Sequence, residues 1–199
     1  MLPPDFDLDQ LHEEELITNR ELRAMGVSSS EVSRLIGRGL LERIGKGVYR
    51  HTNSPVTENH EIKLAAAQVK KSVIVLISAL RFHHLGTQVP HAVWLMIPAK
   101  ARVPTCSWPK LHIVRSRRAE SFSHGVTVHD LEGTKVSITT PARTVADCFK
   151  FRSQLGLDVC LEALRELLTR DRNVMAELTR FARMNRVLRI MQPYLEAIG

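Results

Sequence analysis

In the first part of the chain, apolar residues recur at helical spacing in short segments, and polar residues that can cap a helix precede each segment. Residues 7–16 (D-L-D-Q-L-H-E-E-E-L) predict a short helix with its leucines on one side. Residues 18–21 (T-N-R-E) and 28–31 (S-S-S-E) each place a hydroxyl three positions before a glutamate, which is the capping-box spacing that starts a helix. Gly26 supplies a turn between these two helices. The pattern therefore predicts a helix-turn-helix.

A different pattern follows the third helix, which we expect to end at Gly39. Residues 40–50 (L-L-E-R-I-G-K-G-V-Y-R) alternate apolar and polar positions around a Gly-Lys-Gly tip. Alternation with a period of two on both sides of a glycine-containing turn predicts a β-hairpin. A hairpin directly behind a helix-turn-helix is the wing of a winged helix.

The rest of the chain has strands in its middle and helices at its end. A helix is expected over residues 58–71, and a second short helix, capped by Ser78, is expected to end at Gly86. Candidate strands occupy residues 92–97, 111–116, 126–131 and 135–139, the last two joined as a hairpin across Glu132-Gly133. Thr140-Pro141 starts a helix, and further helices are expected over residues 157–169, 174–184 and 186–192, with Pro193 kinking or restarting the last one.

This order of elements predicts an α+β protein rather than a repeating βαβ fold. We expect a winged helix-turn-helix domain at residues 1–51, a polar linker at residues 52–57, and an α+β domain at residues 58–199. The second domain is expected to contain a small, mostly antiparallel sheet followed by C-terminal helices.

The composition is that of an ordinary globular protein. The chain has 199 residues, of which 44% are hydrophobic and 25% charged. The longest strongly apolar stretch, residues 73–80, is too short to cross a membrane. Residues 1–17 carry six carboxylates and no Lys or Arg, the reverse of a secretory signal, and the 3 cysteines lack C-x-x-C spacing. We therefore expect a cytoplasmic protein without disulfides.

The formal net charge of +7 is unevenly distributed along the chain. Residues 18–50 contain seven Lys and Arg against three Glu, and residues 51–150 contain thirteen against six acids. A concentrated basic segment favours a polyanionic partner, most simply nucleic acid, because neutralising phosphates releases condensed counterions. Charge alone is weak evidence, since many basic surfaces bind nothing.

The second helix of a helix-turn-helix enters the major groove of DNA. Its outer side carries hydroxyl and guanidinium groups that can reach base edges, on Ser29, Ser30, Ser33, Arg34 and Arg38. In the wing, we expect DNA phosphates to be held by Arg43, Lys46, Tyr49 and Arg50. The alternative is a helical cap that contacts another protein.

The second domain is basic as well. One cluster consists of Arg115, Arg117 and Arg118. A second run recurs every three residues, close enough to helical spacing to line one face, at Arg180, Arg183, Arg186 and Arg189. The members that we place on a second basic surface are Arg115, Arg117, Arg118, Arg183 and Arg186. These charges form either a solvated face or a surface for DNA backbone, RNA or a nucleotide.

Motifs for catalysis and metal binding are missing from the sequence. No zinc-site spacing of Cys and His, glycine-rich phosphate loop or G-x-S-x-G occurs, so we expect no metal site, no catalytic residue and no enzyme. The adjacent His83 and His84 point in different directions on a helix, so one is expected to be packed and the other exposed. A nuclease needs a carboxylate and a Lys two apart on a strand, whereas Glu132 and Lys135 are three apart and favour a charged hairpin tip.

Three segments carry a resemblance to a known family. Residues 18–50 resemble the N-terminal winged helix of the AbiEi antitoxin family, through the G-V-S turn and the R-G-L-L-E-R-I-G-K-G-V-Y wing. Residues 75–86 (V-L-I-S-A-L-R-F-H-H-L-G) resemble its S-A-L-x-x-H-x-L helix, and residues 138–147 (I-T-T-P-A-R-T-V-A-D) are similar to its T-x-P-E-R-T-x-x-D helix start. Ala142 stands where the family often has an acid, so no role of that side chain carries over.

The resemblance implies the antitoxin of a type IV toxin-antitoxin system, which represses its own promoter by binding inverted repeats in double-stranded DNA. It also implies a nucleotidyltransferase toxin as functional partner, opposed without a stable complex. The expected repressor is a monomer in solution or a weak dimer, with two copies on DNA, and has no membrane partner and no cofactor. Two alternatives stay open: a stand-alone winged-helix regulator without a toxin, and a winged helix fused to a nuclease.

Overall fold

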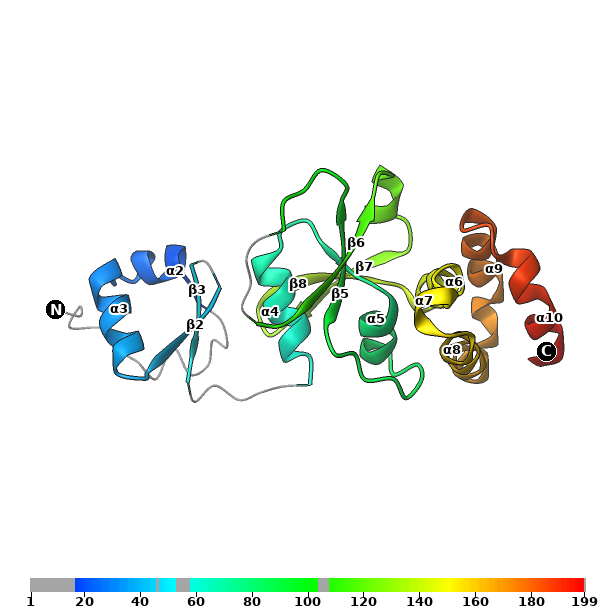
Figure 1. Ribbon diagram of the computed structural model, residues 1–199, viewed down its shortest axis with the longest axis horizontal. Helices are drawn as coiled ribbons and strands as arrows, with labels where there is room; N and C mark the ends of the chain where they lie inside the picture. Colours follow the sequence, from blue (N-terminus) through cyan, green and yellow to red (C-terminus); the bar gives the residue numbers. More distant parts are fainter. Residues whose placement is uncertain (1–16, 46, 53–57, 104–107, 199) are drawn as a thin grey trace.

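The computed structural model describes residues 17–45, 47–52, 58–103 and 108–198 (Figure 1). The N-terminal part consists of β1 (Ile17–Thr18), α2 (Asn19–Ala24), α3 (Ser29–Gly37), β2 (Leu41–Gly45) and β3 (Val48–His51). The three strands form an antiparallel sheet in the order β1-β3-β2. Two helices and a hairpin in this order are a winged helix, as predicted. The helix expected over residues 7–16 lies outside the described residues.

Both predicted capping boxes are present. The Thr18 hydroxyl accepts a hydrogen bond from the Glu21 backbone N–H at 3.3 Å, while the Glu21 carboxylate accepts from the Thr18 N–H at 2.7 Å. Ser28 and Glu31 form the same reciprocal pair at the start of α3. Each box satisfies backbone donors that the first helical turn leaves unpaired. Local hydrogen bonding therefore sets where both short helices begin.

One buried cluster holds the winged helix together. It contains apolar side chains from both helices and all three strands: Ile17, Leu22, Val27, Val32, Leu35, Leu41 and Tyr49. β1 was not predicted, because two residues are too few to show an alternating pattern. Its pairing with β3 places β3 in the centre of the sheet, so consecutive residues of β3 are buried.

The following segment builds a sheet with two flanking helices. Its elements are α4 (His60–Gln68), β4 (Val73–Ile74), α5 (Leu76–Phe82), β5 (Val93–Pro98), β6 (Leu111–Ser116), the short 3-10 helix η1 (Ala119–Phe122), β7 (Val126–Leu131) and β8 (Thr134–Thr139). The five strands lie in the order β6-β5-β4-β8-β7. The strands that the sequence predicted are confirmed, as is the hairpin across Glu132-Gly133.

The α+β class is confirmed, with one correction to the second sheet. We expected it to be mostly antiparallel, but it is mixed: β4–β5 and β7–β8 are antiparallel, whereas β4–β8 and β5–β6 are parallel. The long connection between β5 and β6 returns the chain to the same end of the sheet, which a tight turn cannot do. Connection lengths alone did not reveal that crossover.

Helices make up the C-terminal part of the chain, and Figure 1 shows them gathered beside the sheet. They are α6 (Pro141–Lys150), α7 (Arg152–Leu155), α8 (Leu157–Arg170), the 3-10 turn η2 (Arg172–Val174), α9 (Met175–Met184) and α10 (Leu188–Ile198). Thr140 caps α6 with Pro141 in its first turn, as predicted. No described helix combines the length and the hydropathy required to span a membrane.

Two helix boundaries differ from the expectation. Ser78 does not cap α5, because that helix begins at Leu76; the buried Ser78 hydroxyl accepts a hydrogen bond from the Trp94 N–H at 2.9 Å. Pro193 lies inside α10 instead of interrupting it. The helix continues past the proline because Met191 is buried and Leu195 packs against the same apolar core.

The sheet buries both of its faces. Along β5, Val93, Leu95 and Ile97 pack toward α4 in one cluster, while Met96 belongs to the larger cluster formed with α5, α6, α8 and α9. This alternation follows from the period of two in a strand. The larger cluster joins the sheet to the C-terminal helices.

His83 and His84 differ in burial, as their adjacency predicts: His83 is half-buried and His84 is exposed. A ring nitrogen of His83, Nε2, lies 2.7 Å from the Thr139 carbonyl oxygen. Burial lowers the pKa of His83 below 6.5; the Thr139 carbonyl opposes this shift, and the charges of His129 and His84 add to it.

We expect His83 to make the protein less stable in mild acid. A histidine whose pKa is lowered by folding binds fewer protons in the folded state. Its contribution to the free energy of unfolding is therefore present above pH 6.5 and is lost as the pH falls. His83→Gln should flatten the loss of unfolding free energy below pH 6.5 in urea denaturation, and the exposed neighbour supplies the control, His84→Gln. Equal slopes for both variants would contradict this prediction.

Candidate nucleic-acid interface

The outer face of α3 is open to solvent. Its inner face buries Val32 and Leu35 in the core of the winged helix. The residues predicted to enter the major groove, Ser29, Ser30, Ser33, Arg34 and Arg38, are all exposed. Arg38 is the C-cap of α3, one turn beyond Arg34. The helix therefore presents two guanidinium groups and three hydroxyls on the side away from the core.

The serine hydroxyls of this face are partly used within the helix. Ser33 Oγ donates to the Ser29 carbonyl at 3.1 Å, and Ser30 Oγ lies 3.0 Å from the capping Ser28 Oγ. A hydroxyl that donates to the backbone still has lone pairs to accept a hydrogen bond. Ser33 therefore keeps the capacity to accept a hydrogen bond on the exposed face of α3.

The winged helix carries further exposed arginines outside α3. Arg20 and Arg23 on α2 are exposed, as is Arg43 on β2. Within the part of the chain that the structure describes, neither these residues nor Arg34 and Arg38 form an ion pair. Arg20 and Arg23 were not among the predicted site residues. The signal that could have found them is the position of α2, since the first helix of a helix-turn-helix crosses the DNA backbone.

Two of the predicted wing residues, Tyr49 and Arg50, lie against the protein itself. Tyr49 is only 6% exposed and belongs to the core of the winged helix. Arg50 is engaged within the protein: Nη2 lies 2.6 Å from Glu42 Oε2, and Nη1 donates to His60 Nε2 at 2.9 Å. Tyr49 is therefore buried, and both Nη atoms of Arg50 already have a partner within the protein. Arg43 is exposed near the tip, and Lys46 lies outside the described residues.

The predicted second basic surface is only partly contiguous. Arg115, Arg117 and Arg118 are exposed and lie together around the end of β6. Arg183 is exposed on α9, but Arg186 lies in the turn after it, with a φ of 59°. The arginines from 180 to 189 therefore do not line one helix face, because α9 ends at Met184 and α10 begins at Leu188.

The hairpin tip at Glu132 and Gly133 is a charged turn, as the sequence favoured. Glu132 has a φ of 50° and Gly133 of 80°, and the Glu132 carboxylate accepts from Lys63 Nζ at 2.9 Å. Over residues 17–45, 47–52, 58–103 and 108–198, no group of three or more His, Cys, Asp or Glu is placed to hold a metal ion.

The N-terminal segment matches a known family. Residues 7–51, which are 45 of the 199 residues, match the family model described as transcriptional regulator, AbiEi antitoxin. The resemblance of the winged helix to that family is thereby confirmed. The resemblance of residues 75–86 and 138–147 lies outside this match and stays a prediction. No curated protein matches the chain.

A solved structure has a similar fold. It is the crystal structure of the RV2827C protein from Mycobacterium tuberculosis, with a TM-score of 0.57 and 15% sequence identity, covering 95% of this chain and 79% of that chain. At this identity the likeness concerns the fold alone. It extends across the winged helix and the part that follows it, so both parts occur together in another protein.

Proposed function

We propose that this protein is a DNA-binding transcriptional repressor that reads its operator with α3. The observation that carries the proposal is the exposed face of α3, where Arg34 and Arg38 have no ion pair among the described residues, within the segment that matches regulators of the AbiEi antitoxin family. A repressor needs base-reading donors on a rigid helix that presents them to the groove.

In the proposed complex, α3 lies in the major groove, where Arg34 and Arg38 donate to base edges and Ser29, Ser30 and Ser33 contact bases or adjacent phosphates. Arg20, Arg23, Arg43 and Lys46 neutralise phosphates on either side, which orients the protein without reading sequence. Tyr49 and Arg50 are no longer part of this proposed interface. One winged helix reads a short site, so two copies on an inverted repeat are expected.

The finer proposal is that the repressor is the antitoxin of a type IV system. The part after the linker would then oppose a nucleotidyltransferase toxin without forming a stable complex. The family match of residues 7–51 supports this reading. Co-expression with a neighbouring nucleotidyltransferase gene tests it: relief of growth arrest supports an antitoxin, whereas no such gene or no relief leaves a stand-alone regulator.

Arginine substitutions on α3 and in the wing should have different effects on DNA binding. Arg34→Ala and Arg38→Ala are each expected to reduce discrimination between operator and random DNA by about 1–3 kcal/mol, because a base contact is lost. Lys46→Ala should weaken both DNAs equally and reduce the salt slope of binding by about one unit. Fluorescence anisotropy over a salt series measures both quantities.

The matched control is Arg165→Ala, which removes an exposed arginine from α8. It should leave operator affinity unchanged. Equal losses for Arg34→Ala, Arg38→Ala and Lys46→Ala on operator and random DNA would contradict the assignment of α3 as the reading helix. Binding to the operator no stronger than to random DNA would overturn the repressor itself.

A further inference from the structure

A cavity of about 700 Å³ lies between the sheet and the C-terminal helices. Its walls come from the end of β6, from η1, from α6 and from the end of α9. Pockets of this volume hold ligands the size of cofactors. All of its lining residues lie between positions 75 and 185, so it is separate from the proposed DNA-reading helix.

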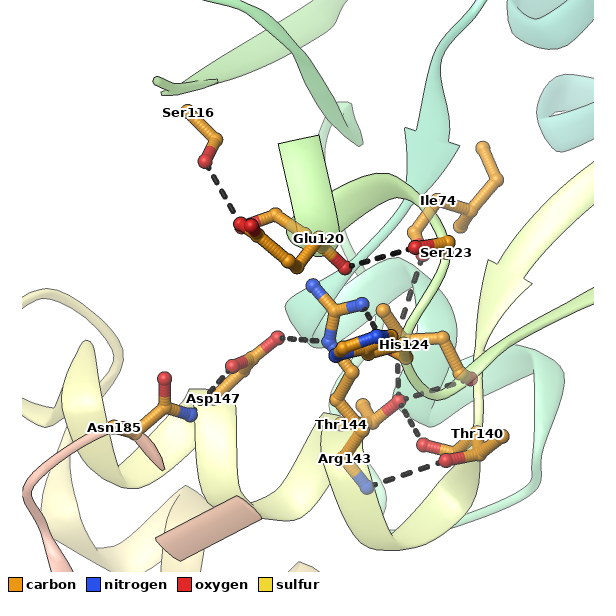
Figure 2. Close-up of polar contacts among 12 residues, drawn as sticks. Ile74, Ser116, Glu120, Ser123, His124, Thr140, Arg143, Thr144, Asp147 and Asn185 are labelled. Atoms are coloured by element: carbon orange, nitrogen blue, oxygen red, sulfur yellow. Dashed lines mark hydrogen bonds and ion pairs between the residues drawn. The ribbon is translucent and has the colours of Figure 1, made fainter. Parts of the chain in front are cut away.

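Arg143 brings a buried cation to the wall of this cavity, since it is only 6% exposed. Its Nε donates to Asp147 Oδ2 at 3.3 Å, and its Nη1 donates to the His124 carbonyl oxygen. Among the described residues, Nη2 has no hydrogen-bond partner, and Figure 2 shows this nitrogen directed away from His124. This nitrogen is solvent-accessible, so it can donate to a ligand in the cavity that Arg143 lines.

The cavity is cationic beyond Arg143. Its lining carries five basic side chains against two carboxylates: Arg115, Arg117, Arg118, Arg143 and Lys150 against Glu120 and Asp147. Arg115 Nη1 is held by the carbonyl oxygens of Ala99 and Ala101, at 2.7 and 2.9 Å. The exposed Arg117, Arg118 and Lys150 form no ion pair in the described part of the chain. Guanidinium and ammonium groups in this arrangement suit a phosphate.

The lining of the cavity also includes apolar and aromatic side chains. They are Phe151, Phe181, Met96 and Met184. Beside these side chains, Asn185 Nδ2 donates to Asp147 Oδ1 at 2.6 Å, which leaves the Asn185 amide oxygen as an acceptor for a hydroxyl (Figure 2). The lining of the cavity therefore combines basic groups, apolar side chains and acceptors for hydroxyl groups.

We propose that this cavity binds a nucleoside monophosphate. The phosphate lies against Arg143 Nη2, Arg118 and Lys150, the base packs on apolar side chains of the lining, and the sugar hydroxyls reach the Asp147–Asn185 pair. The basic cluster at residues 115–118 thereby belongs to a small-molecule site. The proposal does not depend on DNA binding.

Isothermal titration of the full-length protein with the four common nucleoside 5′-monophosphates tests this site, with inorganic phosphate and adenosine as partial ligands. At least one nucleotide should bind one-to-one, at least about tenfold more tightly than either partial ligand, because only the nucleotide contacts both the basic and the apolar side chains. Absence of binding by all four nucleotides at about 1 mM would overturn the proposal.

Surface variants then locate the bound nucleotide without disturbing the core. Met184 is 44% exposed at the edge of the cavity, so Met184→Glu should fold and should weaken nucleotide binding about tenfold by repelling the phosphate. Lys150→Ala should weaken it several-fold. The matched controls are Thr169→Glu and Arg165→Ala on α8, outside the cavity, which should leave binding unchanged.

Equal affinities of Met184→Glu, Lys150→Ala and the wild-type protein would show that nucleotides bind elsewhere, and the assignment of this cavity would be wrong. Tight binding of inorganic phosphate with no gain from the nucleoside would also overturn the proposed ligand class. Operator binding, measured on the same variants, should not change. A loss of both activities in one variant would indicate unfolding, which circular dichroism detects.

Discussion

Arg143→Met is expected to lower the free energy of unfolding by about 3–5 kcal/mol. The Arg143 and Asp147 side chains are only 8% and 14% exposed, and their Nε–Oδ2 distance is 3.3 Å. Burial raises the pKa of Asp147, and Arg143 and Asn185 oppose this shift by interacting with its carboxylate. Removing the cation leaves that carboxylate buried without its main counter-charge, which urea denaturation at pH 7 measures.

The matched control is Arg180→Met, which breaks an ion pair within one helix at the surface. Arg180 Nη2 lies 3.7 Å from Glu177 Oε1, and the two side chains are 63% and 37% exposed. An exposed pair of this kind contributes at most about 1 kcal/mol. Equal losses of unfolding free energy for Arg143→Met and Arg180→Met would show that burial does not determine the cost of breaking an ion pair.

The pH dependence supplies a second test of the same pair. A carboxyl whose pKa is raised by folding binds more protons in the folded state. The contribution of Asp147 to the free energy of unfolding is therefore fully present below pH 3.8 and is lost as the pH rises. The loss of unfolding free energy caused by Arg143→Met should therefore be smaller at pH 4 than at pH 7. Adding Asp147→Asn should recover part of the loss at pH 7, because the buried charge is removed.

The winged helix was predictable because its signals are local. The Thr18–Glu21 and Ser28–Glu31 capping boxes act over three residues, and the glycines around the wing tip mark a turn that sequence shows directly. The burial of Tyr49 was not predictable in this way. It depends on β1, whose two residues carry no periodicity but turn β3 into a central strand.

The cavity was only partly visible in the sequence. The cluster at residues 115–118 is compact in the chain, and its charge drew attention to it. Arg143 and Asp147 lie one turn apart on α6, and Asn185 meets them only after α6 and α9 pack together. One signal could have indicated them: a charged pair four residues apart on α6, a helix whose other faces are apolar and buried. Charge inside an otherwise buried helix needs partners, and those partners identify the site.

The close packing around Arg143 predicts a second large effect, at Gly125. This residue has a φ of +63°, and a Cβ added to it would lie 2.4 Å from Phe181 Cζ and 3.0 Å from Arg143 Cδ. Phe181 is only 2% exposed, so its ring can move only toward the cavity that it lines, and that shift disturbs its packing in the core. Gly125→Ala should therefore lower the free energy of unfolding by roughly 2–5 kcal/mol, the sum of the backbone cost of a positive φ and of overpacking.

Gly133→Ala separates these two contributions. Gly133 has a φ of +80°, yet no atom lies within 4 Å of the position of an added Cβ. Gly133→Ala therefore has only the backbone cost of a positive φ. The loss of unfolding free energy measured by urea denaturation should be about 1–3 kcal/mol larger for Gly125→Ala than for Gly133→Ala. Combining Gly125→Ala with Phe181→Leu should destabilise less than the two single changes added together, because the smaller side chain relieves the contact. Two results would contradict this account: strictly additive losses of unfolding free energy in the double variant, or equal losses for Gly125→Ala and Gly133→Ala. Either result would show that Gly125 is needed only for its positive φ and that an added Cβ does not clash with Phe181.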